Sequence, residues 1–188
     1  MAAGISRAQS VTLRQVLKER TRVLHDQLDA AIGQAALASD AGYAAFLQTQ
    51  YAARAPIERW ARASLDPRLL PPATAALIAE DLKSLGNSLP DEESFAFPRH
   101  ADPRGLAWAL GGSALGNKAM LTQRRRGGRT GSDRFLSDTA TADFFRRLMP
   151  MLQITVADDE ADAAVAGAEA VFRTFLAASS RRSMRAAA

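Results

Sequence analysis

DPRGLAWALGGSALGNKAMLT, residues 102–122, predicts one helix that carries glycines at positions where helices usually avoid them. Asp102 suits the N-cap and Pro103 suits the first helical position, so the start of this helix is well specified. The helix should end near Arg126, where Gly127 and Gly128 break it. Gly111, Gly112 and Gly116 each cost about 0.5–1 kcal/mol relative to alanine, roughly 2–3 kcal/mol together. Another interaction must therefore offset this loss of helix stability.

The glycines share a helix face with other small residues. Gly112 and Gly116 are four residues apart, and Gly105 and Ala109 extend the same stripe towards the start of the helix. Such a stripe lets a flat surface approach the backbone. Either a second helix crosses there or a planar ligand lies against it, and the spacing alone favours the crossing helix.

The rest of the 188-residue chain also predicts helices, because alanine is abundant and no segment alternates cleanly between apolar and polar residues. We expect one all-α domain, residues 1–188, with an ordered core over about 11–178 and flexible ends at 1–10 and 180–188. The other expected helices cover about 11–32, from Asp40 with a kink at Pro56, 72–84 before a left-handed cap at Gly86 and Asn87, 138–156 with a kink at Pro150, and 158–179. Residues 87–101 and 129–137 predict loops, with Phe135 and Leu136 as anchors in the second.

Composition excludes several classes of site. The chain has no cysteine, which removes disulfides, thiolate zinc sites and iron–sulfur clusters and fits a reducing cytoplasm. We expect a soluble cytoplasmic protein without a membrane span or signal peptide. The net charge of +4 is concentrated in two arginine clusters, 124–129 and 181–185, but the aromatic residues do not interleave with them. We therefore expect no nucleic-acid partner.

His25 lies beside the apolar stripe of the first predicted helix. A lone histidine there is most often structural, but Lys18 lies about 10 Å along the axis and within about 20° of the same face. Thr21 and Leu28 share that surface. A ligand bound by the imidazole would thus meet a cation with its acidic edge. His100 is expected at the surface, and the absence of a Glu-x-x-His motif argues against a di-iron site.

Two motifs resemble the haem oxygenases. KERTRVLHDQLD, residues 18–29, resembles their proximal helix, and GSALG, residues 112–116, resembles their distal helix. The resemblance extends over about residues 13–176 and is to the bacterial, biliverdin-producing type. It implies a single-domain helical bundle of the haem-oxygenase type, with haem sandwiched between a proximal helix and a kinked, glycine-rich distal helix.

The resemblance also assigns roles on the proximal side. His25 matches the iron ligand, with Thr21 and Leu28 beside the ring. Lys18 matches a cation that pairs with one haem propionate, and Arg146 or Arg147 would supply a second such contact.

On the distal side, Gly112 and Gly116 match the glycines that let the backbone lie over the haem. Ser113 would assist the bound oxygen through its hydroxyl or a held water. The chain departs from the family at Asn117, where many members have a second consecutive glycine, and at Gly111, where bacterial members often have glutamate. Haem binding is therefore better supported than turnover.

The implied reaction uses O2 and electrons from an external donor, a ferredoxin or a reductase, to cleave haem to biliverdin, carbon monoxide and Fe(II). A bilin-binding photoreceptor is a candidate acceptor of the product. Two alternatives stay open at this point: a haem carrier or sensor that does not degrade its ligand, and a helical protein-interaction domain without haem.

Overall fold

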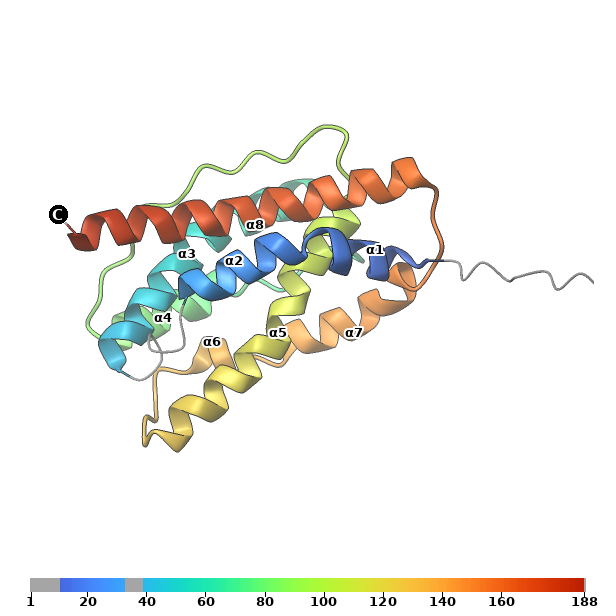
Figure 1. Ribbon diagram of the computed structural model, residues 1–188. Helices are drawn as coiled ribbons and strands as arrows, with labels where there is room; N and C mark the ends of the chain where they lie inside the picture. Colours follow the sequence, from blue (N-terminus) through green and yellow to red (C-terminus); the bar gives the residue numbers. More distant parts are fainter. Residues whose placement is uncertain (1–10, 33–38, 188) are drawn as a thin grey trace, which may run out of the picture.

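The chain folds into a bundle of helices. The computed structural model describes residues 11–32 and 39–187, and within these ranges it contains eight helices and no strand (Figure 1). The helices are α1 (Leu13–Arg20), α2 (Arg22–Ile32), α3 (Asp40–Ser64), α4 (Ala75–Ser84), α5 (Pro103–Arg126), α6 (Arg134–Ser137), α7 (Ala140–Leu152) and α8 (Asp158–Ala187). The predicted all-α, single-domain fold is confirmed. The predicted flexible segment 1–10 lies outside the described residues.

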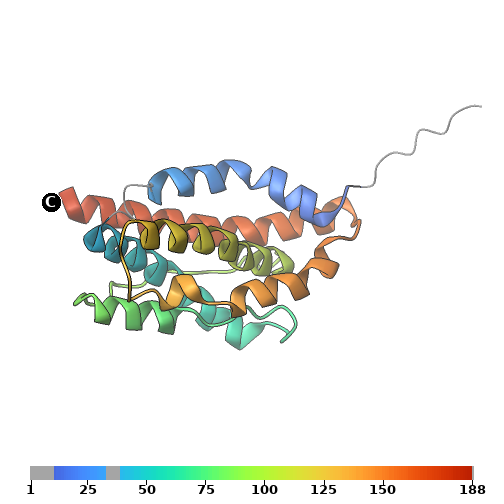
Figure 2. The same ribbon diagram turned by 90° about the horizontal axis from the view of Figure 1, so that it is seen from below.

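The longest helix, α8, organises the packing. It lies along α1 and α2 on one side, as both views show, and it also packs against α3 and α5 (Figures 1 and 2). In turn α5 packs against α6 and α7, while α4 packs against α3 and α6. Apolar side chains at helical spacing produce these contacts, such as Leu13 and Leu17 of α1 and Phe144 and Leu148 of α7, which share one buried cluster with Phe172 of α8.

The glycine-bearing helix has the predicted ends. The Asp102 carboxylate accepts a hydrogen bond from the Arg104 backbone N–H at 2.7 Å, and Pro103 occupies the first turn, where its missing N–H costs nothing. At the other end Gly127 is the C-cap, and Gly128 has a positive φ of 73°, a conformation that favours glycine.

The first predicted helix, by contrast, is two helices that meet at Thr21. Its backbone turns out of the helical range, with φ −96° and ψ 0°, and its hydroxyl donates to the Leu17 carbonyl at 2.8 Å. A threonine hydroxyl that bonds the preceding turn competes with the helix ladder and often bends the chain. The break divides α1, which carries Lys18, from α2, which carries His25.

Helix α8 extends beyond its predicted end at residue 179 and continues to Ala187. Two ion pairs explain the extension. Arg181 lies 2.7 Å from Glu93 and Arg185 lies 2.7 Å from Asp91, both on the non-helical segment before α5. These two acidic partners stabilise the last turns of α8, which the local sequence alone does not stabilise.

Smaller differences concern helix ends. Helix α4 begins at Ala75, because the Glu58 carboxylate accepts from the backbone N–H groups of Thr74 and Ala75 at 2.9 and 3.1 Å. The predicted left-handed cap after α4 is formed by Gly86, with φ 71°. The predicted loop 129–137 contains the short helix α6, in which Phe135 and Leu136 are buried as expected.

Candidate functional site

The glycines of α5 fall into two groups. A Cβ atom on Gly105 would lie 1.8 Å from the Ala164 carbonyl oxygen of α8, and one on Gly111 would lie 2.8 Å from a ring carbon of Phe145 on α7. Both glycines are needed where neighbouring helices approach the backbone. The expected helix crossing therefore exists, but only at these two positions.

Gly112 and Gly116 have no such neighbour. A Cβ atom on Gly112 would come no closer than 4.0 Å to Phe145, and one on Gly116 no closer than 3.6 Å to Met120. Both are ordinary contact distances, so alanine would fit and would favour the helix. Among the described residues, protein packing does not account for these two glycines.

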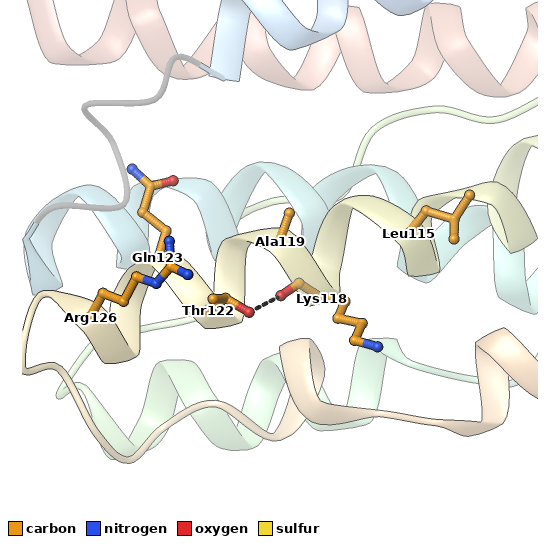
Figure 3. A pocket seen from close by; sticks show the side chains of 6 residues that line it. All are labelled: Leu115, Lys118, Ala119, Thr122, Gln123 and Arg126. Atoms are coloured by element: carbon orange, nitrogen blue, oxygen red, sulfur yellow. Dashed lines mark hydrogen bonds between the residues drawn. The ribbon is translucent and has the colours of Figure 1, made fainter.

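An open hollow lies along the second half of α5. It has a volume of about 620 Å³ and is lined by Leu115, Lys118, Ala119, Thr122, Gln123 and Arg126 (Figure 3). The side chains of Ala119 and Gln123 point towards the ribbons of α2 and α8. Leu115 is 74% exposed, which is unusual for a leucine beside a small-residue stripe. Two cations, Lys118 and Arg126, border this apolar surface.

His25 of α2 is held by its own helix. Its side chain is 56% exposed, and Nδ1 lies 3.2 Å from a carboxylate oxygen of Asp29, one turn later. A carboxylate at Nδ1 keeps the proton on that nitrogen and leaves Nε2 as the atom that can bind a ligand.

Phe172 of α8 connects this histidine to α5. Its ring centroid is 6.1 Å from that of His25 and 6.2 Å from that of Trp108, both in edge-on arrangements. Trp108 lies one turn before Gly112 on α5. In the described part of the chain, α2 packs against α8 and has no extensive contact with α5. The imidazole and the uncovered glycines thus belong to two helices that are joined through α8.

Ser113 points to the other side of α5, towards α3. Its hydroxyl donates to the Leu110 carbonyl at 2.7 Å and accepts a hydrogen bond from the Arg54 guanidinium at 2.8 Å. Asn117, one turn later, is 7% exposed. Both polar side chains of this segment are therefore directed into the protein or covered by it.

No protein-family model matches the sequence, and a search of curated proteins finds no match. A search of solved structures finds the NO- and CO-bound haem oxygenase from Neisseria meningitidis, with a TM-score of 0.70 at 19% sequence identity. The superposition covers 92% of this chain and 92% of that one. The chain has the haem oxygenase fold. Its helices α2 and α5 are those in which the sequence motifs resembled the proximal and distal helices of haem oxygenases.

In this haem oxygenase fold, the predicted site residues of the proximal side lie in different surroundings. Lys18 is exposed on α1. Thr21 is fully buried with its hydroxyl bonded to Leu17, and Leu28 is partly buried against the core. Arg146 and Arg147 are exposed on α7, and Arg146 pairs with Asp143 at 3.0 Å. The structure thus brings His25 and Leu28 onto one helix and leaves Thr21 at the α1–α2 junction.

Three residues near this site were not identified from the sequence. Asp29 could have been found, because it follows His25 by one helical turn. Lys118 lies in the hollow, but an exposed lysine carries no signal of its own. Arg54 is 2% exposed and lies 59 residues before its partner Ser113. Arginines are so often solvated that nothing in the local sequence distinguishes a buried one.

The arginine clusters are largely paired. Arg124 and Arg129 lie 3.3 and 3.1 Å from Asp40, and Arg125 lies 3.1 Å from Asp133. Arg124 is also 3% exposed, with its guanidinium 3.7 Å from the ring centroid of Tyr43. The cluster at residues 124–129 therefore ties the end of α5 to the start of α3.

Burial also perturbs two groups in the interior. Desolvation raises the pKa of the Tyr43 hydroxyl well above its usual value, and Asp81 acts in the same direction. Desolvation lowers the pKa of Arg54, against the opposing effect of Glu58. In the described ranges, no helix is both long enough and apolar enough to cross a membrane.

Proposed function

We propose that this protein is a haem oxygenase that binds haem between α2 and α5 and cleaves it. The observation that carries the proposal is the pairing of an exposed imidazole with an uncovered glycine backbone. His25 and the Gly112–Gly116 turn lie on two helices that both pack on α8, with Phe172 between the rings of His25 and Trp108.

The residues present fit haem. The iron needs a neutral imidazole, and the Asp29 contact at Nδ1 leaves Nε2 of His25 for that bond. The flat porphyrin needs a surface without side chains, which Gly112 and Gly116 provide. Without a ligand the same two glycines only weaken α5. The proposal thus accounts for a feature that protein packing leaves unexplained.

The propionates of haem need cations at the edge of the site. Lys18 is exposed on α1 and lies across the Thr21 break from His25, so the two side chains no longer share one continuous helix face as the sequence predicted. Lys118 lies in the hollow on the α5 side, and Arg147 is exposed on α7. We assign the propionates to Lys18 and to one of these two side chains, because two fixed charges at one edge set the rotation of the porphyrin in its plane.

Bound haem supplies the iron at which O2 is reduced, with electrons from an external donor. The residues of this chain bind and orient the group: His25 fixes one face, Lys18 and the second cation fix the edge, and the α5 backbone excludes water from the other face. Because the orientation decides which meso carbon faces the oxygen, these contacts select the position of ring opening. The Ser113 hydroxyl takes no part in these contacts in this conformation, because it faces α3, donates to Leu110 and accepts from Arg54.

We extend the proposal to the products biliverdin, carbon monoxide and Fe(II), to a ferredoxin or reductase as electron donor, and to the cytoplasm as location. A bilin-binding photoreceptor stays a candidate acceptor. The support for these finer points is the sequence resemblance together with the fold.

The test begins with haemin titrated into the purified protein. We expect a Soret band at one haem per chain, which then decays to a broad red bilin absorption when a reductant is added under air. His25→Ala should lose the axial bond and shift the Soret band while the helix content stays unchanged. His100→Ala, which changes the exposed histidine before α5, should behave like the wild type. An unchanged spectrum in His25→Ala would refute the assignment of the ligand.

A haem carrier or sensor is the second candidate function. Two observations favour it: Gly111, at the position of the family's glutamate, is packed against Phe144 and Phe145, and Asn117 is nearly buried beside the glycine turn. Neither position, 111 or 117, therefore supplies a carboxylic acid next to Gly112. A Soret band that persists through the addition of reductant and air would support this function and exclude turnover.

A further inference from the structure

Arg54 lies in the interior, at the middle of α3. It is 2% exposed, and its guanidinium has a partner in each direction: Nε donates to Gln50 at 3.1 Å, Nη1 to Thr74 at 3.3 Å and Nη2 to Ser113 at 2.8 Å. The rings of Phe135 and Phe175 lie 5.2 and 5.6 Å from its central carbon. The side chain is therefore fixed on all sides.

The charge of Arg54 is balanced indirectly. The Thr74 hydroxyl accepts from Arg54 and donates to the Glu58 carboxylate at 2.9 Å. Glu58 in turn caps the start of α4 through the N–H groups of Thr74 and Ala75. A continuous chain of hydrogen bonds thus runs from α4 through α3 to α5. Burial makes every member of such a chain hard to remove without loss.

Stability alone does not require this arrangement. Replacing a buried charged network with apolar side chains of similar volume is often neutral or favourable, so a buried arginine is weak evidence of a stabilising role. The end of this network, however, is specific. It contacts α5 at Ser113, which lies between the two uncovered glycines and donates its hydroxyl proton to the Leu110 carbonyl at 2.7 Å.

This contact matters because α5 is weakest there. Gly112 and Gly116 carry no side chain that could pack and hold the turn, and glycine is the least favourable non-proline residue in a helix. On this stretch Ser113 faces α3, where the strong donor is Arg54. We propose that Arg54 is a positioning residue: through the Ser113 hydroxyl it holds the Gly112–Gly116 turn at the distance from His25 that haem requires.

The inference rests on the proposed function, but its first test needs no haem. Hydrogen exchange is measured on the haem-free protein in peptides that cover residues 111–118. In Arg54→Met and in Ser113→Ala these amides should exchange about tenfold faster, the ratio expected for losing one buried charged hydrogen bond. Peptides of α7 should not change. Arg62→Met, an exposed arginine on the same helix, is the matched control.

The second test reads the haem site itself. The haem affinity and the infrared C–O stretch of the carbon monoxide complex are measured for the same variants. Arg54→Met should bind haem about tenfold more weakly and broaden the C–O band, because the turn is no longer held in one position. Arg54→Lys keeps the charge and part of the reach, so it should recover part of both losses.

The outcomes are distinguishable. Unchanged exchange in residues 111–118 would overturn the inference, and so would faster exchange with wild-type affinity and a wild-type C–O band, which describes a purely structural arginine. If Arg54→Met does not fold, Ser113→Ala decides by the same two readouts. A wild-type protein without a Soret band refutes the proposed function instead, and the exchange data then still decide whether Arg54 holds α5.

Discussion

The Nδ1 atom of His25 lies 3.2 Å from the Asp29 carboxylate, and both side chains are more than half exposed. The pair follows from helix geometry, since residues four apart lie on one face. It orients an imidazole that would otherwise rotate freely at the surface, with Phe172 limiting the ring from the α8 side. Helix α2 therefore holds the His25 ring in one orientation, with Nε2 free to bind a ligand.

Asp29→Asn should weaken haem binding by about 10–100-fold, because the carboxylate that fixes the orientation of the ring is lost. Haem titration measures the affinity, and resonance Raman spectra of the ferrous complex should show a weaker iron–histidine bond. Asp26→Asn removes a neighbouring exposed carboxylate and serves as control. Equal effects of the two variants would mean that only the net charge of α2 matters.

Gly116→Ala should stabilise the haem-free protein by about 0.5–1 kcal/mol and weaken haem binding, since the added methyl group favours the helix and covers the backbone. Gly111→Ala should instead destabilise the protein by about 1–3 kcal/mol, because its Cβ would lie 2.8 Å from Phe145. Thermal unfolding with and without haem separates these effects. A destabilised Gly116→Ala protein would show that protein already covers this glycine.

Tyr43→Phe should stabilise the protein by about 1 kcal/mol at neutral pH, because the buried hydroxyl has no hydrogen-bond partner among the described residues. The pKa of Tyr43 is raised, so its contribution is fully present below about pH 10 and is lost as the pH rises towards the folded value. Urea unfolding at pH 7 and pH 10.5 should therefore show a larger advantage of phenylalanine at the higher pH. If the stability of the wild type and of Tyr43→Phe changed in parallel with pH, the raised pKa of Tyr43 would be contradicted.

Arg181→Ala should cost about 1–3 kcal/mol, whereas Arg185→Ala should cost less than about 1 kcal/mol. The difference lies in their partners: the Glu93 side chain is 4% exposed and loses its cation in the interior, while that of Asp91 is 74% exposed and returns to water. Denaturant unfolding of both variants measures this. Equal losses of stability in the two variants would mean that the burial of the acidic partner makes no difference.

The sequence predicted the elements that local residues determine. Asp102 and Pro103 placed the start of α5, and the following Gly127 and Gly128 placed its end, because capping depends on a few neighbouring residues. The break at Thr21 could not be predicted, since a threonine hydroxyl can bond either the helix or a neighbour. The extension of α8 depends on Asp91 and Glu93, which lie about 90 residues away.

The candidate site was predictable to a similar degree. His25 and the glycines carry local signals, and the fold agrees with the resemblance that they suggested. The division of the glycines into packed and uncovered ones was not predictable, because Gly105 meets Ala164 only after α8 has folded back. The direction of Ser113 depends likewise on Arg54, a residue of α3.

The contact at Gly105 also restricts how the protein can move. Because the α5 and α8 backbones touch there, the first turns of α5 cannot shift without separating the two helices that pack most extensively against each other. Past Leu110 no comparable contact exists on the side of Gly112 and Gly116. The last turn of α5 is tied in its own way, because Arg124 and Arg129 lie 3.3 and 3.1 Å from Asp40 at the start of α3. The uncovered glycines thus lie in a span whose two ends are both fixed, so a planar ligand meets a backbone that is already in place.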